Sequence, residues 1–265
     1  MALSPEPERA PDVSECEAQS LPTEMTAARV EAHGHLDALK LRTIAVPHPG
    51  PGEVLVSVRA AGLNHLDLWV RKGVPGHTFP LPLTPGCDGA GVVIALGPGT
   101  RRAKIGDEVI IAPGLSCGVC AACVRGNDPL CTQYGILGET RDGTCAEYVL
   151  VPEANLLPRP SQVPWPLAGC FALVSLTAWT MLVDRARLQP GETILVLAGG
   201  SGVGSLAIQI GRYIGCRVIA TAGGSEKCAR LRTLGADETI DHNTEGISER
   251  VLELTDQQGV NVVFE

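Results

Sequence analysis

The sequence predicts a protein of class α/β plus β, in which an all-β domain is followed by a doubly wound parallel sheet. Between residues 27 and 160, short β runs are separated by glycine and proline, and Glu53–Gly62 alternates apolar and polar side chains. Runs at such spacing are typical of a small barrel or sandwich. From residue 190 onward, apolar runs of strand length alternate with stretches of helical spacing, which indicates parallel βαβ units.

The domain boundaries follow changes in composition along the 265 residues, a length that is enough for two domains. Residues 1–24 are rich in proline and glutamate and have almost no apolar periodicity. We therefore expect a disordered tail there, either regulatory or the product of an over-extended gene start. The all-β domain is predicted at residues 25–165, with a cysteine lobe at residues 114–133, and the parallel-sheet domain at residues 166–265.

Composition argues against several classes of protein. The net charge of −8 does not favour a nucleic-acid-binding surface. The chain has no long apolar run, so no membrane span is expected. Its N-terminus is acidic where a signal peptide would be basic. We expect a cytoplasmic protein whose ten cysteines are mostly free thiols and metal ligands.

Four cysteines form the most specific motif of the all-β half. Cys117, Cys120, Cys123 and Cys131 have the spacing C-x2-C-x2-C-x7-C, and four soft sulfur ligands suit a closed tetrahedral zinc site. The last gap is too long for a ferredoxin cluster motif, and no proline follows the fourth cysteine. Four buried or disulfide-paired thiols are the alternative. The prediction is one structural zinc ion per chain.

The parallel-sheet domain opens with the apolar run Thr193–Leu197, as expected for a strand that is covered on both faces. A glycine-rich turn and a helix with apolar spacing follow. The elements expected after them are a strand at Arg217–Ala220, a helix at Glu226–Leu234, a strand at Glu238–Ile240, a helix at Ile247–Thr255 and a strand at Val260–Phe264.

The glycine-rich turn is the predicted dinucleotide site. Glycines let the backbone approach a pyrophosphate, and the N-terminus of the following helix attracts the anion. The strand before the turn and the helix after it supply the context that such a motif needs; a turn without a ligand is the alternative. The expected cofactor-binding residues of this turn are Gly199, Gly200, Ser201, Gly202, Val203 and Gly204.

Five motifs, in this order, resemble the medium-chain dehydrogenase/reductase superfamily, which includes zinc alcohol dehydrogenases and quinone oxidoreductases. They are GPGEVLVSVRAAGLNHLD, PGCDGAGVV, GDEV, the four-cysteine lobe and AGGSGVG. The resemblance covers residues 27–265. It implies a GroES-like β-barrel catalytic domain, a Rossmann domain and hydride transfer with a nicotinamide cofactor in the cleft between them.

The chain departs from this family at the second, catalytic zinc. The three ligand positions fall on Asn64, on Cys87 and near Leu173, with Cys170 offset by about one helical turn. Asparagine is a poor zinc ligand and leucine is none. An improvised site of Cys87 and Asp88 with His65 is the alternative; we expect the second site to be lost.

The segment GLNHLDLWVRKG resembles quinone oxidoreductases, in which Asn, Asp, an aromatic ring and Arg line the cleft. By this resemblance the cleft residues are Asn64, Asp67, Trp69 and Arg71, and Thr177 takes the place of a small hydroxyl residue near the nicotinamide. The candidate catalytic residues are Asn64, Asp67 and Thr177. The structural alternatives are a turn cap for Asn64, a backbone acceptor for Asp67 and an ordinary helix threonine for Thr177.

The end of the second strand of the Rossmann domain predicts the choice of cofactor. Rossmann domains that prefer NAD place Asp or Glu there, to bind the ribose 2′-hydroxyl, and this position falls on Ala222. Ser225 and Lys227 offer a hydroxyl and a cation, so NADP(H) is predicted over NAD(H). Glu226 argues for NAD(H) instead, because its carboxylate would bind the ribose 2′-hydroxyl if the side chain turned inward.

Hydride transfer from NADPH to a quinone, enone or related carbonyl compound is the leading prediction. A zinc-dependent alcohol dehydrogenase with an altered metal site, and a catalytically silent nucleotide-binding or redox-sensing protein that uses Cys87, are the alternatives. Family members continue beyond the strand at Val260–Phe264, so an incomplete sheet with an apolar edge strand is expected, in either a fragment or a defective relative. At full length we expect a homo-oligomer, a dimer or tetramer.

Overall fold

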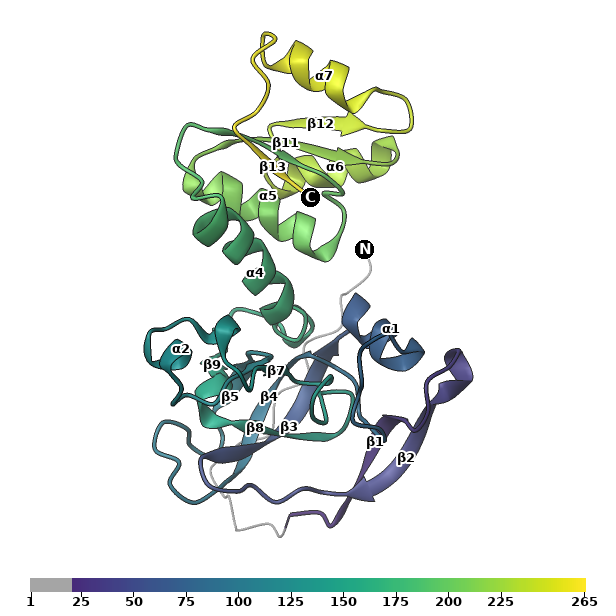
Figure 1. The fold of residues 1–265 in the computed structure, drawn as a ribbon, viewed down its shortest axis with the longest axis vertical. Helices are drawn as coiled ribbons and strands as arrows, with labels where there is room; N and C mark the ends of the chain where they lie inside the picture. Colours follow the sequence, from purple (N-terminus) through teal and green to yellow (C-terminus); the bar gives the residue numbers. More distant parts are fainter. Residues whose placement is uncertain (1–20) are drawn as a thin grey trace, which may run out of the picture.

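The computed structural model describes residues 21–265 as two parts, a mainly antiparallel β domain and a parallel-sheet domain, with one helix, α4, between them (Figure 1). The strands are β1 (Glu24–Val30), β2 (Leu39–Ala45), β3 (Glu53–Gly62), β4 (Asp88–Leu96), β5 (Glu108–Ile111), β6 (Gly114–Leu115), β7 (Gly135–Ile136), β8 (Tyr148–Pro152), β9 (Leu156–Pro158), β10 (Thr193–Val196), β11 (Arg217–Ala222), β12 (Glu238–Asp241) and β13 (Val262–Phe264).

The helices are α1 (His65–Lys72), α2 (Ala121–Val124), α3 (Trp165–Ala168), α4 (Ala172–Trp179), α5 (Gly202–Ile214), α6 (Ser225–Leu234) and α7 (Ile247–Leu254). The chain continues from α4 into a wider π-helical turn at Thr180–Arg185. Short 3-10 turns lie at Leu36–Ala38, Asp128–Leu130 and Glu153–Asn155. Among the helices of residues 21–265, none combines the length and the apolar character that crossing a bilayer requires.

The β domain is built on a five-stranded sheet with the order β8-β3-β4-β5-β9, in which all neighbours are antiparallel. Val54 and Val56 of β3 point into the core of this domain, as their alternation predicts. The sequence predicted a half-buried strand, but Leu55 is also fully buried, because the β1–β2 ribbon covers the opposite face with Met25 and Val46. The start of β3 is therefore covered on both faces.

The predicted tail extends into the described residues at its last four positions, and there the prediction was wrong. Glu24 begins β1, the N–H of Val46 donates to the carbonyl oxygen of Thr23 at 3.0 Å, and Leu21 packs against the apolar cluster under the β1–β2 ribbon. These contacts make residues 21–24 part of the β domain. Residues 1–20 lie outside the described residues.

The second domain is the predicted parallel sheet, with the strand order β12-β11-β10-β13. Helices α5 and α6 cover one face through a core that includes Ile208 and Leu231, and α7 covers the other face through Val251. Strand β13 lies at the edge, and Val263 is 56% exposed there, as expected for an apolar edge strand. The carboxyl ends of β10, β11 and β12 lie at one edge of the sheet, which is where parallel α/β sheets bind ligands.

The predicted element boundaries needed small corrections. Strand β11 continues to Ala222, because its last residue still pairs with Asp241 of β12. Helix α6 begins one residue earlier than predicted, at Ser225, after Gly224 adopts a φ of 97° that favours glycine. Strand β10 and helix α7 each end one residue earlier than predicted, and β13 begins two residues later.

Candidate metal centre and dinucleotide site

The cysteine lobe brings its four predicted ligands together. The Sγ atoms of Cys117, Cys120, Cys123 and Cys131 all lie within 4.8 Å of one another. The distance is 3.5 Å between Sγ of Cys120 and Cys123, and 3.9 Å between Sγ of Cys117 and Cys123. A tetrahedral ion with Zn–S bonds of about 2.3 Å requires sulfur pairs about 3.8 Å apart. The four thiols therefore fit a closed zinc site, and none of them is bonded in a disulfide.

Backbone N–H groups surround the sulfurs as they do around thiolate ligands. The N–H of Cys120 donates to Sγ of Cys117 at 3.4 Å, and the N–H groups of Cys117 and Gln133 donate to Sγ of Cys131 at 3.4 and 3.3 Å. The N–H of Cys123 lowers the pKa of Cys120 to about 6, whereas burial raises the pKa of Cys123 to about 11. A divalent cation deprotonates coordinating thiols outright, so a zinc ion at this site would bind both Cys120 and Cys123 as thiolates.

A network of hydrogen bonds lies at the position where the resemblance places the second, catalytic zinc of the family. The amide Nδ2 of Asn64 donates to Oδ2 of Asp88 at 2.9 Å, with a longer contact of 3.4 Å to Sγ of Cys87. The other carboxylate oxygen of Asp88 accepts the N–H of Leu173, in the first turn of α4, at 2.7 Å. Asp88 thus connects the start of β4 to α1 and to the helix that leads into the second domain.

Within the described part of the chain, the zinc lobe is the one group of three or more His, Cys, Asp or Glu side chains whose ligand atoms converge. The alternative site of Cys87, Asp88 and His65 is therefore not assembled. Burial, followed by the negative charges of Asp67 and Asp88, raises the pKa of the Cys87 thiol far above its usual range. A buried, protonated thiol is a poor metal ligand and a poor redox sensor.

The carboxylate of Asp67 accepts hydrogen bonds from backbone N–H groups, which is the structural alternative to a catalytic role. Its two carboxylate oxygens accept the N–H groups of Asn64 at 2.7 Å and of Gly86 at 2.8 Å, and the residue is buried. Burial raises the pKa of this carboxyl, while the backbone hydrogen bonds oppose that rise. Asp67 therefore holds the start of α1 against the loop before β4.

The remaining predicted cleft residues are dispersed. Trp69 is 53% exposed and lies beside His65, with ring centroids 6.5 Å apart, whereas Arg71 is buried. Thr177 is exposed on α4, and its hydroxyl donates to the carbonyl oxygen of Leu173 at 3.2 Å. This is the hydrogen bond of an ordinary helix threonine. Arg71 does not line the cleft surface in the way that the resemblance implied.

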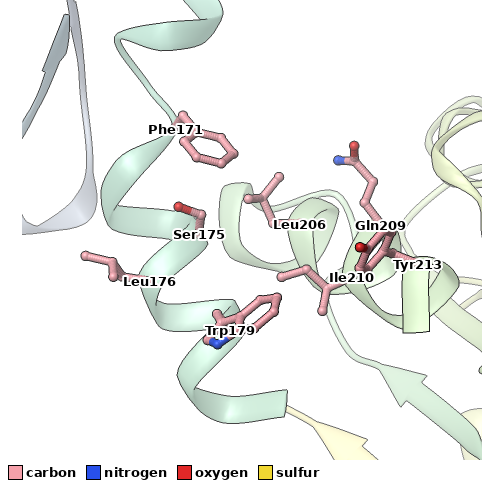
Figure 2. Close-up of a pocket in the computed structure, with 8 residues that line it drawn as sticks. All are labelled: Phe171, Ser175, Leu176, Trp179, Leu206, Gln209, Ile210 and Tyr213. Carbon is pink, nitrogen blue, oxygen red and sulfur yellow. The ribbon is translucent and has the colours of Figure 1, made fainter. Parts of the chain in front are cut away.

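A cavity of about 630 Å³ between α4 and α5 is lined mainly by apolar side chains (Figure 2). Trp179 and Leu176 come from α4, and Ile210 and Tyr213 from α5. The residues that line it include no charged side chain. This cavity therefore offers no cationic side chain to bind the phosphates of a dinucleotide.

A second cavity, of about 660 Å³, lies at the carboxyl ends of β10, β11 and β12. Gly200 and Ser201 line it from the glycine-rich turn, and Lys227 lines it from α6. Its walls also contain Gly223, the residue that follows β11, and Arg230. Arg230 is not among the predicted cofactor-binding residues, although it follows Lys227 by three residues and such spacing places two side chains on one face of a helix.

The glycines of the turn have separate roles. A Cβ on Gly204 would lie 2.5 Å from the carbonyl oxygen of Ala198, so this position needs the close backbone approach that glycine permits. A Cβ on Gly199 would lie 2.9 Å from Cδ1 of Leu231, and that side chain would have to shift. Nothing lies within 4 Å of a Cβ on Gly200, which faces the cavity. The turn thus leaves open backbone where a pyrophosphate would approach.

Ser201 caps α5, because its Oγ accepts the N–H of Gly204 at 3.0 Å. Gly202 is the first residue of this helix and faces α4, where its Cβ would lie 3.2 Å from Cγ1 of Val174. Val203 packs against the sheet core. Ser225 begins α6 outside the residues that line the cavity. The predicted cofactor residues that line the cavity are therefore Gly200, Ser201 and Lys227.

Comparison with known proteins agrees with this geometry. Residues 50–161 match the alcohol dehydrogenase GroES-like domain family, and residues 202–265 match the zinc-binding dehydrogenase family. A crystal structure of an NAD-dependent alcohol dehydrogenase is 49% identical, with a TM-score of 0.87, over 90% of this chain and 70% of that one. The chain belongs to the medium-chain dehydrogenase/reductase superfamily. The GroES-like domain and the Rossmann-type sheet that the sequence predicted are confirmed.

Two curated members of the superfamily show the range of activities among its relatives. Alcohol dehydrogenase 1 of Emericella nidulans is 35% identical over 84% of this chain and 63% of its own length. A quinone oxidoreductase of Pseudomonas aeruginosa is 34% identical over 88% of this chain and 64% of its own length. The chain thus spans slightly less than two thirds of the length of these two relatives, and about half of the length of others, such as the crotonyl-CoA carboxylase/reductase of Cereibacter sphaeroides at 54%.

Cysteine reactivity in this medium-chain dehydrogenase/reductase chain should follow burial. At pH 8 we expect iodoacetamide to alkylate the exposed Cys170 and to leave Cys87 and Cys145 unmodified. The thiolate is the nucleophile, and burial raises the pKa of Cys145 to about 12 and that of Cys87 further. Peptide mass spectrometry of the zinc-loaded chain measures this order. Alkylation of Cys87 as fast as of Cys170 would contradict it, and labelling in denaturant, where all three react, is the control.

Proposed function

We propose that this protein is a zinc-stabilised oxidoreductase that transfers a hydride from NADPH to a quinone, enone or related carbonyl compound. The observation that carries the proposal is the network of Asn64, Asp88 and Leu173 at the position of the catalytic metal. These side chains supply a hydrogen-bonded carboxylate, an amide and an alkyl group, whereas a catalytic zinc needs three protein ligands and an open position. Lowering the pKa of an alcohol substrate depends on such an ion.

The cavity at the strand ends fits a dinucleotide. Gly200 faces it with open backbone, the N-terminus of α5 lies beside it, and Lys227 adds a positive charge. When bound, the nicotinamide supplies the hydride. The zinc ion, held by the four cysteines of the lobe, supplies folding energy and no chemistry, because all four positions are taken by protein.

Polarising the substrate carbonyl is the remaining task, and we assign it to Asn64. One amide hydrogen of Asn64 is held by Asp88 at 2.9 Å, and the other makes only the 3.4 Å contact with Cys87. That second hydrogen is the donor available to a substrate oxygen, where it would act as a single oxyanion-stabilising group. Thr177, exposed on α4, is the proposed neighbour of the nicotinamide.

The preference for NADP(H) is supported by the charges near the end of β11. Ala222 provides no carboxylate for a ribose 2′-hydroxyl, and Lys227 lines the cavity. Glu226, the counter-argument from the sequence, is directed into solvent, with 81% of its side chain exposed and an ion pair to Arg230. The similar structure that is 49% identical is an NAD-dependent alcohol dehydrogenase, which favours NAD(H) instead. Titration with NADPH and with NADH distinguishes the two cofactors.

Turnover and metal content test this proposal together. We expect the protein to oxidise NADPH with an enone or quinone, to leave ethanol unoxidised with NAD⁺, and to contain one zinc ion per chain. Ethanol oxidation with two zinc ions per chain would instead establish an alcohol dehydrogenase with an altered metal site. Tight nucleotide binding without turnover on any carbonyl substrate would establish a silent nucleotide-binding protein. Asn64→Ala should lower kcat at least tenfold while leaving nucleotide affinity unchanged, since it removes the proposed donor.

A further inference from the structure

Helix α6 places an ion pair at the mouth of the dinucleotide cavity. Nη2 of Arg230 lies 2.6 Å from Oε1 of Glu226, one helical turn earlier. Arg230 lines the cavity together with Lys227, and Glu226 does not. Both partners of the pair are well exposed, with 75% of the Arg230 side chain and 81% of the Glu226 side chain accessible.

The walls of this cavity have an uneven distribution of charge. Lys227 and Arg230 are its two permanent cations, and His242 and Asn243 close it from the loop after β12; no carboxylate lines it. Asp241, the last residue of β12, accepts the N–H groups of Gly224 at 2.8 Å and of Asn243 at 3.1 Å. These backbone donors lower the pKa of Asp241. Its carboxylate is therefore hydrogen-bonded to the backbone of Gly224 and Asn243.

We propose that Arg230 is a second cation for the ribose 2′-phosphate of NADP(H), and that Glu226 restrains it until the phosphate binds. This inference rests on the proposed function. In the free protein Arg230 pairs with Glu226; in the complex it exchanges the carboxylate for the phosphate. An exposed i,i+4 ion pair contributes little, because water screens it and ordering two long side chains costs entropy. A phosphate offers arginine a bidentate partner that carries more charge.

The exchange gives Glu226 a function that a structural ion pair would not have. Because Glu226 competes with the phosphate for the same guanidinium, its removal should strengthen binding of a 2′-phosphorylated nucleotide. Removal of Arg230 should weaken that binding. Since Glu226 acts only through Arg230, its effect should vanish when Arg230 is absent. Such dependence of one substitution on the other is the signature of a direct coupling.

The experiment compares binding of 2′,5′-ADP and of 5′-AMP by calorimetry, because these two probes differ only in the 2′-phosphate. We expect Arg230→Gln to weaken 2′,5′-ADP about tenfold, the loss of one charge-assisted contact, with 5′-AMP changed less than about twofold. Glu226→Gln should tighten 2′,5′-ADP about two- to threefold, as expected for release of a weak exposed pair. In the double variant Glu226→Gln/Arg230→Gln, affinity should equal that of Arg230→Gln alone.

Arg232→Gln is the matched control, because it removes the same charge from the same helix at a residue outside the cavity walls. Equal weakening by Arg230→Gln and Arg232→Gln would show a long-range charge effect and overturn the inference while leaving the proposed function intact. A Glu226→Gln effect that persists without Arg230 would also overturn it. Failure of the unmodified protein to bind either probe, or tighter binding of 5′-AMP than of 2′,5′-ADP, would overturn the proposed cofactor and the inference together.

Discussion

Replacement of Cys120 by serine is expected to release the zinc ion and to unfold the cysteine lobe. The four sulfurs converge within 4.8 Å, and the lobe buries few large apolar side chains of its own. Val119 and Val124, on either side of Cys120 and Cys123, are 82% and 75% exposed, so they contribute almost no apolar burial. Structural zinc supplies on the order of 10 kcal/mol of folding free energy in small zinc domains. The same loss is expected on removal of the ion by a chelator.

Elemental analysis and thermal unfolding measure this result. The unmodified chain should contain one zinc ion, and Cys120→Ser should contain none and melt in two steps or at a lower temperature. Cys170→Ser is the control, because that thiol is exposed and lies outside the lobe. Two zinc ions per chain would contradict the assignment of a single closed site. An unchanged melting curve after chelation would show that the lobe is held by other contacts.

Sequence reasoning predicted the elements of the parallel sheet within one or two residues, because each was marked by local signals. Continuous apolar runs identified the strands, and glycines at Gly215 and Gly235, with φ values of 94° and 112°, ended two of the helices. The tail boundary could not be placed in this way. The partial burial of Leu21 depends on its packing against the cluster of Met25, Val46 and Leu55, and such tertiary contacts leave no periodic pattern in a short segment.

The residues of the candidate site also fall into two groups, those predictable from local spacing and those that depend on contacts distant in sequence. The four cysteines of the lobe are close in sequence, so their spacing alone predicted that their sulfurs converge. The role of Asp88 could not be read, because its partners Asn64 and Leu173 are 24 and 85 residues away. The sequence predicts that the second metal site is lost, and in the structure Asn64 donates a hydrogen bond to Asp88 at that position. The assignment of Arg71 to the cleft relied on the resemblance, whereas the orientation of α1 in this chain buries that residue.

Asp88→Ala is expected to destabilise the fold strongly. The carboxylate is 1% exposed and accepts the amide of Asn64 at 2.9 Å and the N–H of Leu173 at 2.7 Å. Its removal takes the acceptor from both donors in a partly buried site, and each unsatisfied group costs about 1–3 kcal/mol. We therefore expect a loss of about 3 kcal/mol in the free energy of unfolding, measured by urea denaturation. Asn64→Ala, which removes one donor and leaves the acceptor in place, should cost less.

The pH dependence of stability distinguishes the carboxylate from its isosteric amide. Burial is the main cause that raises the pKa of Asp88 above the value of an unfolded aspartate. Between those two pKa values the folded state binds more protons than the unfolded state, so the contribution of Asp88 to stability is greatest at pH below about 4 and falls as pH rises through the folded pKa. Asp88→Asn abolishes this titration. The difference in unfolding free energy between the unmodified chain and Asp88→Asn should therefore shift against the unmodified chain as pH rises from 3 to 7. A difference that is constant across this range would show that Asp88 titrates as it does in the unfolded chain.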